Sequence, residues 1–358
     1  MRAAIPEECF RISLPRALAH LAASVAIVGG LVALGTLIPL SWAWLPVWLL
    51  YAVATGTAAT GLWVIAHECG HGAFARNAVL QDTVGFVLHS AMLVPYFSWQ
   101  RSHGVHHART NHLDEGETHV PGRAPATPAE AADPAGTADG PARRPARLGP
   151  NGAAAVTLVR NLLLGWPAYL LFGASSGPAR AQANHFWPVA PFRSELFPAR
   201  WHARVWASAA GVLAVLGLLV AWAVAAGSVV PVLALYVGPL LVVNAWLVTI
   251  TWLQHTDVDI PHYAEPEWSW ALGAFQTVDR PYLPVIDWLH HRIGTTHVAH
   301  HIDFRIPHYR ARQATVALRE AFPDWYLYDP TPVSLALWRV ARDCHAVQET
   351  PEGWFFTD

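Results

Sequence analysis

The stretch of sequence that decides the fold runs from Ala17 to His67 and reads ALAHLAASVAIVGGLVALGTLIPLSWAWLPVWLLYAVATGTAATGLWVIAH. It contains no Asp, Glu, Lys or Arg, and a second stretch from Val205 to Thr256 has the same property. The hydrocarbon core of a bilayer requires about 20 consecutive apolar residues per helix. Each stretch is therefore long enough for two membrane spans, and Pro39 to Pro46 and Ala226 to Pro231 provide the turns between them.

We expect four spans in two hairpins, at about residues 18–38, 44–66, 205–226 and 232–253. Tryptophans near the span ends fit an aromatic belt: Trp42, Trp44, Trp48, Trp201, Trp206 and Trp252. Neither turn carries a basic residue, whereas many arginines fall on the opposite side: Arg11, Arg16, Arg76, Arg101, Arg204, Arg280, Arg292 and Arg310. The positive-inside rule then predicts that both termini face the cytoplasm.

The composition agrees with a membrane protein. Hydrophobic residues make up 53% of the 358 residues and charged residues only 13%, about half the usual share in a soluble domain. The net charge of −2 argues against a nucleic-acid partner. The three widely spaced cysteines imply no disulfide framework. The N-terminus lacks the pattern of a cleaved signal peptide, so membrane insertion would depend on the spans themselves.

Two further apolar segments, Val84–Phe97 and Asn161–Phe172, are too short or too interrupted to span, and we expect helices in the membrane interface or beneath the spans. Residues 121–150 are rich in Ala, Pro and Gly, which predicts a disordered loop. The expected fold is one all-α integral membrane domain over residues 1–358, with four transmembrane helices in two hairpins, interfacial helices and a cytoplasmic helical cap that carries a metal site.

That metal site is expected from three histidine clusters just outside the apolar stretches. The clusters are His67-Glu68-Cys69-Gly70-His71, His103-Gly104-Val105-His106-His107 and His297-Val298-Ala299-His300-His301. Imidazole is the commonest protein metal ligand, and helical residues three or four apart share a face. His255 ends the fourth span on the same side as His67 and His71. The clusters supply too many imidazoles for one four-coordinate zinc, so we expect two metals. Spacing alone does not choose among Fe, Zn, Cu and Ni.

Two other functions compete with this interpretation. The letters of the first cluster match the HExxH helix of zinc metalloproteases, including those that cleave within membranes, but that function leaves the other two clusters unexplained. A metal transporter would place its ligands near the bilayer midplane, whereas these lie beyond the span ends. The remaining isolated histidines are expected to have structural roles: His20, His89, His112, His119, His185, His202 and His345.

The three clusters, in this order around two hydrophobic hairpins, resemble the histidine boxes of the membrane-bound fatty acid desaturases. Connecting sequence strengthens the resemblance: DTVGFVLHSAMLVPYFSW before the second box, then LGWPAYLLFG, VNAWLVTITWLQHT and TVDRP, and finally THVAHH followed by IPHYRARQAT. These segments are most similar to the omega-6 (delta-12) oleate desaturases. The resemblance runs from about Ile5 to the C-terminal region and is interrupted mainly by the Ala/Pro-rich loop.

The resemblance implies two iron ions held by His67, His71, His103, His106, His107, His297, His300 and His301, with His255 as a further ligand. It also implies an O₂-dependent reaction that removes two hydrogens from an acyl chain, with a cis double bond introduced at delta-12 of an oleoyl-type chain. The iron centre would perform the chemistry and the protein would orient the substrate, so no catalytic residue is expected beyond the metal ligands.

The chain departs from similar family members after the third box, where it reads Asp303-Phe304-Arg305-Ile306. Those members usually have an uncharged run of apolar and small residues at the first few of these positions. Asp303 and Arg305 could form an ion pair or orient a ligand, or they could face solvent. These positions are candidates for tuning the outcome, because sister enzymes with similar boxes act as hydroxylases, epoxidases, acetylenases or conjugases.

The resemblance also implies partners. We expect a fatty acyl substrate linked to lipid, coenzyme A or acyl carrier protein. No flavin, nicotinamide or haem-binding motif is evident, so the electrons would come from a separate donor, cytochrome b5 or ferredoxin with its reductase. The expected location is a bacterial inner membrane or the endoplasmic reticulum membrane, with the histidine boxes on the cytoplasmic side.

Overall fold

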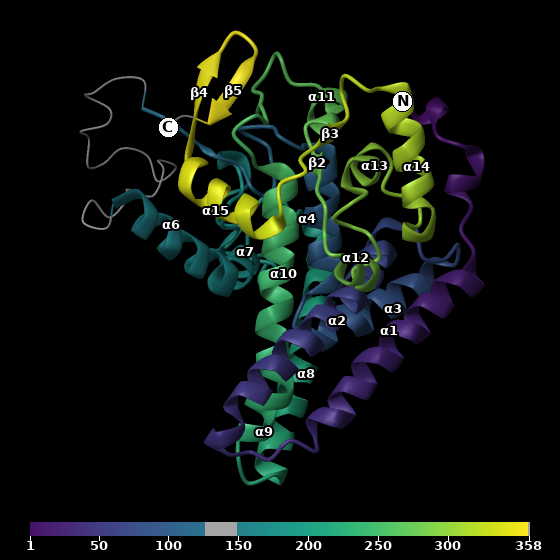
Figure 1. Cartoon of the computed structure of the whole chain (residues 1–358), viewed down its shortest axis with the longest axis vertical. Coiled ribbons are helices and arrows are strands. Elements are labelled where there is room, and N and C mark those ends of the chain that lie inside the picture. The colour runs from purple at the N-terminus through teal and green to yellow at the C-terminus, as the bar shows by residue number, and fades with distance from the viewer. Residues whose placement is uncertain (126–148, 357–358) are drawn as a thin grey trace.

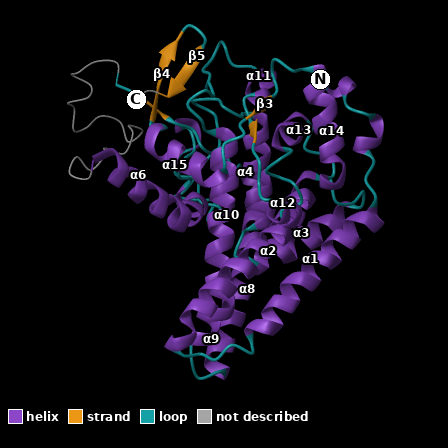
Figure 2. Cartoon of the chain, in the orientation of Figure 1, coloured by secondary structure: helices purple, strands orange, loops and turns teal. Residues whose placement is uncertain are grey.

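The computed structural model describes residues 1–125 and 149–356. Most of the expected disordered loop, residues 126–148, lies outside the described residues. The described chain is mainly helical (Figure 2), which confirms the all-α class, and its strands are few and short.

Long apolar helices occupy the positions of all four expected spans. They are α1 (Leu14–Gly35), α2 (Leu45–His71), α8 (His202–Ala225) and the helix made of α9 (Val230–Val232), a π-helical turn (Leu233–Val237) and α10 (Gly238–His255). Together they form a stem with the two hairpin turns at its lower end, while the ends of the described chain lie in the cap at the other end (Figure 1). The chain is therefore a membrane protein whose hairpins were predictable from the charge-free stretches.

The centre of the stem is the contact between α2 and α10, which bury the aliphatic residues Val64, Leu247 and Leu253. Gly56 allows their close approach, because a Cβ at this position would lie 2.4 Å from the carbonyl oxygen of Pro239. The end of α2 is fixed by Gly72, which adopts a left-handed φ of 75° and terminates the helix directly after the first histidine box.

Two further apolar regions flank the stem. In the first, α3 (Ala78–Ala91) and α4 (Tyr96–Ala108) meet at an angle of 103°. In the second, α6 (Gly149–Arg160), a π-helical turn (Asn161–Gly165) and α7 (Trp166–Phe172) form one longer helix, with α6 beneath α15 in Figure 1. Length and composition would allow five described helices to cross a membrane, or six if the bent pair forms one span. The count of four spans and the interfacial position of the other two segments therefore stay predictions.

The cap consists of the short helices and strands that follow α10, together with strand β1 and the N-terminal residues. Its helices are α11 (Trp270–Phe275), α12 (Pro284–Leu289), α13 (His297–Ile302), α14 (His308–Ala321) and α15 (Val333–Asp343). Strand β4 (Ala346–Thr350) pairs with β1 (Gly122–Arg123) and β5 (Gly353–Phe356), and β2 (Val278–Asp279) pairs in parallel with β3 (Leu327–Tyr328). The β2–β3 pair lies beside α13 and helps to position the third box.

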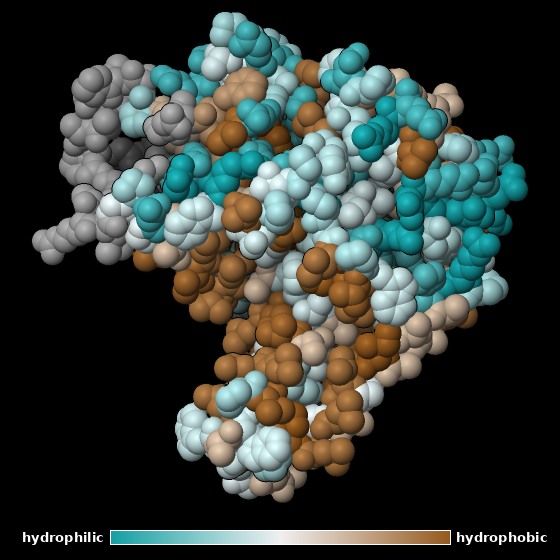
Figure 3. Space-filling model, in the orientation of Figure 1, coloured by the Kyte–Doolittle hydropathy of each residue, from teal (hydrophilic) through white to brown (hydrophobic). Residues whose placement is uncertain are grey.

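The surface divides in the same way as the fold. Hydrophobic surface covers the stem in Figure 3, whereas hydrophilic surface gathers over the cap. The large exposed apolar side chains include Leu49, Leu50, Leu218, Val220 and Val224 on the stem helices. An exposed apolar surface of this kind is typical of a part that contacts a membrane. The histidine boxes lie where the stem meets the cap.

Candidate metal centre

Four helices bring the histidine boxes together. The first box ends α2, the second occupies the last turns of α4, the third forms most of α13, and His255 is the last residue of α10. Residues i and i+4 lie on one helix face, so each box directs its rings toward the same region. All nine histidines named above as expected ligands lie in this cluster of contacting rings.

One group of five rings lies between α2, α4 and α13: His67, His71, His103, His107 and His300. One nitrogen from each ring lies within 4.8 Å of one nitrogen from each of the others. Nε2 of His67 lies 3.2 Å from Nε2 of His71, and the Nε2 atoms of His103 and His107 are 3.1 Å apart. The group is able to hold a metal ion.

A second group contains His106, His255 and His301, whose nitrogens also lie within 4.8 Å of one another. His297 adjoins it, because its Nε2 lies 3.0 Å from Nε2 of His255, which in turn lies 3.1 Å from Nε2 of His106. Oγ1 of Thr110 lies 3.1 Å from Nδ1 of His301. This contact orients the ring, so that its Nε2 faces the other histidines of the group. The nine histidines thus divide into two neighbouring groups of five and four.

The chemistry of both groups fits metal ions. Two nitrogens bound to one ion at about 2.1 Å and at right angles to each other lie roughly 3.0 Å apart, which matches the spacings of the nitrogen pairs. The buried Nε2 atoms of His300 and His301 have no hydrogen-bond partner among the described residues. Burial lowers the pKa of His300 to about 3, and it lowers the pKa values of His297 and His301 as well. These imidazoles are therefore neutral at pH 7, the form that binds metals.

A buried acid holds the third box in place. Oδ1 of Asp279 accepts a hydrogen bond of 2.9 Å from the backbone N–H of Val298 in the first turn of α13, and Oδ2 accepts one of 2.7 Å from the Tyr326 hydroxyl. Its neighbour Arg280 is fully buried and donates to the carbonyl oxygen of Leu253 at 2.8 Å. The segment 279–280 thus connects α13 to the end of α10, where His255 lies.

The geometry of Glu68 argues against the metalloprotease. In that class, the glutamate of HExxH acts as a general base beside the zinc. Here Oε2 of Glu68 instead accepts hydrogen bonds from the backbone N–H of His308 at 2.9 Å and contacts Nδ1 of the same residue at 3.0 Å. Glu68 is therefore engaged by α14.

The four residues after the third box take different positions. Asp303 is buried and forms an ion pair of 2.8 Å with Arg305, whose side chain remains 52% exposed, so Arg305 both pairs and faces solvent. The ring of Phe304 lies 4.8 Å from that of His71 and 5.2 Å from that of His107, measured between centroids. Ile306 packs with Val298 in the core of the cap. Phe304 is thus the member of this set in contact with the five-histidine group.

Three features near the centre are not evident from the sequence. The ring of His119 lies parallel to that of His255, with centroids 6.4 Å apart. The Tyr169 hydroxyl lies 2.7 Å from Oε1 of Glu117 and 2.9 Å from Oγ of Ser102, and burial raises the pKa of Glu117 to about 8. A third histidine group contains His20, His291 and His308. None of these arrangements follows a sequence motif, because each joins residues distant in the chain.

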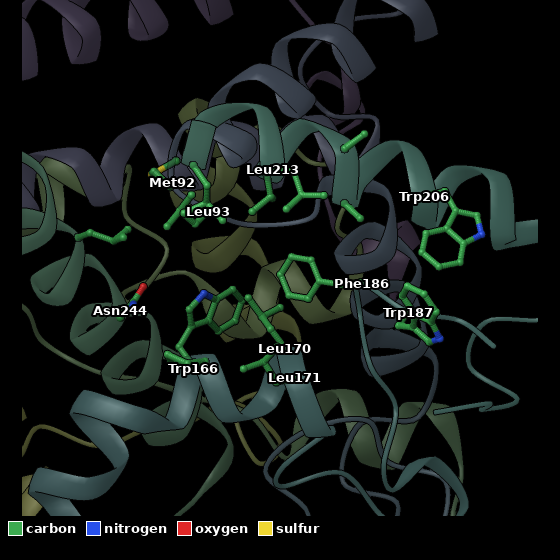
Figure 4. A pocket seen from close by; sticks show the side chains of 16 residues that line it. Met92, Leu93, Trp166, Leu170, Leu171, Phe186, Trp187, Trp206, Leu213 and Asn244 are labelled. Carbon is green, nitrogen blue, oxygen red and sulfur yellow. The ribbon is translucent and has the colours of Figure 1, made fainter. Parts of the chain in front are cut away.

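Two cavities share Trp166 in their linings, and one of them reaches the five-histidine group. The larger, of about 690 Å³, is almost entirely apolar and lies between α7, α8 and α10; Figure 4 shows Trp166, Leu170, Phe186 and Leu213 around it. A smaller cavity of about 110 Å³ is lined by His103, Trp99 and Trp63, and also by Trp166. Trp166 therefore forms part of both cavities, and the second reaches a histidine of the site.

The fold and site define a helical membrane protein with two adjoining histidine groups that could bind metal. The family model for fatty acid desaturases matches residues 42–332, and the chain belongs to this family. The sequence-based expectation of an oxidoreductase that acts on fatty acyl chains in a membrane is thereby confirmed.

Curated relatives cover nearly the whole chain. A Delta(12)-fatty-acid desaturase from Arabidopsis thaliana is 39% identical over 99% of this chain and 88% of its own length. A Delta(12)-acyl-lipid-desaturase from Punica granatum is 38% identical over 97% of this chain and 86% of its own length. An Oleoyl-12-hydroxylase from Ricinus communis is also 38% identical, over 97% of this chain and 86% of its own length.

Proposed function

We propose that this enzyme introduces a cis double bond at the delta-12 position of an oleoyl-type chain. The observation that carries the proposal is the 39% identity over 99% of the chain to a protein named for delta-12 desaturation. The reaction converts –CH₂–CH₂– to –CH=CH– while O₂, two electrons and two protons form two molecules of water. Two iron ions in the two histidine groups would supply the oxidation of the unactivated methylene groups.

The nine histidines would hold the two ions in two neighbouring sites. His67, His71, His103, His107 and His300 would hold one ion, and His106, His255, His297 and His301 the other. Thr110 and Asp279 fix the orientation of the third box through the contacts described above. The ring of Phe304 and the indoles of Trp63 and Trp99 lie against the five-histidine group and limit the access of water to it.

The acyl chain would approach through the two cavities. The larger one opens among apolar side chains of α7 and α8, which suits a hydrocarbon chain that arrives from the bilayer. A chain that passes Trp166 would reach the smaller cavity beside His103. The name of the relative from Punica granatum supports an acyl group carried on lipid, whereas coenzyme A and carrier protein remain alternatives that the test below separates.

The second candidate activity is hydroxylation of the same chain. The relative from Ricinus communis, named as an oleoyl hydroxylase, is as similar to this chain as several relatives named as desaturases. Both outcomes begin with attack on the same methylene groups, so the centre and the cavities would serve either. Asp303, Phe304, Arg305 and Ile306 are the positions that we expect to influence the outcome, Phe304 above all because of its contact with the site.

The electron donor and the orientation of the protein in the membrane are part of the same proposal. A reduced carrier, cytochrome b5 or ferredoxin with its reductase, would deliver electrons at the cap, over which hydrophilic surface gathers. Both termini and the boxes would face the cytoplasm, as the distribution of arginines predicts. A relative from Brassica juncea is named as an enzyme of the endoplasmic reticulum; that membrane and a bacterial inner membrane are the two candidate locations.

The test is expression of the full chain in a host that makes oleate but no polyunsaturated fatty acids. Gas chromatography of the fatty acid methyl esters should then reveal linoleate. After a pulse of labelled oleate, labelled linoleate should appear first in the lipid fraction, and its first appearance on coenzyme A or acyl carrier protein would assign the substrate to that carrier. A hydroxylated or acetylenic product would replace delta-12 desaturation by a sister activity. Unchanged fatty acids, despite a membrane-inserted protein that contains iron and an added electron donor, would contradict the proposal.

A further inference from the structure

A third histidine group lies apart from the nine histidines of the centre. It joins His20 of α1, His291 in the segment after α12 and His308 at the start of α14. One nitrogen of each ring lies within 4.8 Å of one nitrogen of each other ring. These side chains surround a cavity of about 190 Å³ between α1, α2 and the cap. Three imidazoles from three segments thus line one cavity, and this arrangement is independent of the proposed function.

His308 has the arrangement of a metal-binding histidine. Its Nδ1 lies 3.0 Å from Oε2 of Glu68, while its buried Nε2 has no hydrogen-bond partner among the described residues. His308 is only 9% exposed. A carboxylate on one ring nitrogen fixes the tautomer and orientation of an imidazole whose other nitrogen binds a metal. Glu68 would serve as this outer partner, which accounts for its contact with His308.

The backbone around His291 is constrained in a way that places its ring in the cavity. His291 and Arg292 both adopt a left-handed φ, 51° and 66°, which is uncommon for residues other than glycine. The preceding segment also approaches α2 closely, since a Cβ at Gly61 would lie 2.3 Å from the carbonyl oxygen of Leu289. Strained conformations of this kind cluster at functional sites. Nε2 of His291 lies 3.2 Å from Oγ of Ser24 and thus points toward α1.

We propose that His20, His291 and His308 bind one Zn²⁺ ion, with Glu68 as the carboxylate that orients His308. Three histidines and one open position form a known zinc coordination set. Nitrogens on one tetrahedral zinc are roughly 3.3 Å apart, so small side-chain rotations would complete the site. Arg16 and Arg292 are the cationic groups near the cluster, and Glu68 is the anionic group that offsets them. The ion would link α1 to the segments on both sides of the third box.

The test measures zinc in the purified full-length protein in detergent. After mild chelation and addition of Zn²⁺, we expect the wild type to bind about one more equivalent of zinc than His291→Asn, with equal iron contents measured by mass spectrometry. Asn tolerates a left-handed φ, so this variant retains the backbone conformation but is too short to bind. His20→Phe should also lose the zinc while its ring can still stack on Tyr309, as that of His20 does. His202→Ala, a control at the start of α8, should retain it.

A second measurement distinguishes this site from zinc bound at the nine-histidine centre. Co²⁺ should give the visible absorption bands of a tetrahedral ion in the wild type and in His300→Ala, but with much lower intensity in His291→Asn. Zinc should raise the melting temperature of the wild type more than that of His291→Asn. Equal zinc uptake by wild type and His291→Asn would overturn the proposal, as would zinc lost only in His300→Ala. A failure of the desaturation assay would leave these readouts unaffected.

Discussion

At the scale of single residues, the centre depends on buried imidazoles that are neutral at pH 7. His300 illustrates this dependence, because it is buried, its pKa is lowered to about 3, and its Nε2 has no other partner in the described chain. His300 lies instead among four other histidines of the five-histidine group. Such a side chain is costly to bury unless it binds something.

The first prediction concerns this residue. His300→Ala should remove one proposed ligand, lower the iron content and reduce product formation by more than about 100-fold, since even outer partners of metal ligands are worth roughly 10–100-fold. Membrane insertion should be unchanged, because α13 lies outside the stem. Product analysis together with iron measurement checks this, with His202→Ala as the control. Full activity in His300→Ala would remove His300 from the ligand set.

The sequence predicts the parts of the site whose residues lie close together in the chain. His67 and His71 share a helix face at a fixed spacing, so their convergence follows from helix geometry alone. The division into groups of five and four depends instead on how α13 is rotated against α4, which Asp279 and Thr110 determine through contacts distant in sequence. His20 was expected to be structural for the same reason: its partners are His291 and His308, which lie far along the chain.

At the scale of elements, a stem helix can combine an exposed apolar side with a side that lines a cavity. Helix α8 shows both: Leu218 is 69% exposed on the stem, whereas Ala209 is 7% exposed and lines the larger cavity. The charge-free sequence predicts such a helix but does not predict which of its faces borders a cavity. That face is determined by contact with α7, which a long connection separates from α8 in the chain.

The second prediction tests the proposed path for the acyl chain. Ala209→Phe places a ring in the cavity and should lower conversion of long-chain substrate several-fold, with unchanged iron content because no histidine is moved. Leu218→Phe, on the exposed side of the same helix, is the matched control and should retain wild-type conversion. Comparison of product yields at equal protein levels provides the measurement. Equal conversion by both variants would exclude this cavity as the route.

At the scale of the whole molecule, the junction of stem and cap buries many ionisable side chains. Outside the membrane-spanning helices, burial lowers the pKa values of His185 and His262 to about 3. His185 lies in the connection between α7 and α8, and His262 lies in the segment that follows α10. Nδ1 of His185 lies 3.2 Å from the carbonyl oxygen of Leu170, and its Nε2 lies 2.9 Å from Oγ of Ser102.

The last prediction is a loss of stability in mild acid. In the unfolded chain these imidazoles bind a proton below their ordinary pKa of about 6.5, whereas in the fold they stay neutral until about pH 3. Their contribution to stability is therefore fully present above about pH 6.5 and is lost as the pH falls toward 3. At pH 5 each residue should lower the free energy of unfolding by about 2 kcal/mol relative to pH 7.

Melting of the purified protein in detergent, followed by tryptophan fluorescence, should show a midpoint temperature that is lower at pH 5 than at pH 7. The fall should be smaller in His185→Gln, which keeps a polar side chain but does not titrate, and equal pH dependence of the two proteins would contradict the assignment of a buried neutral His185.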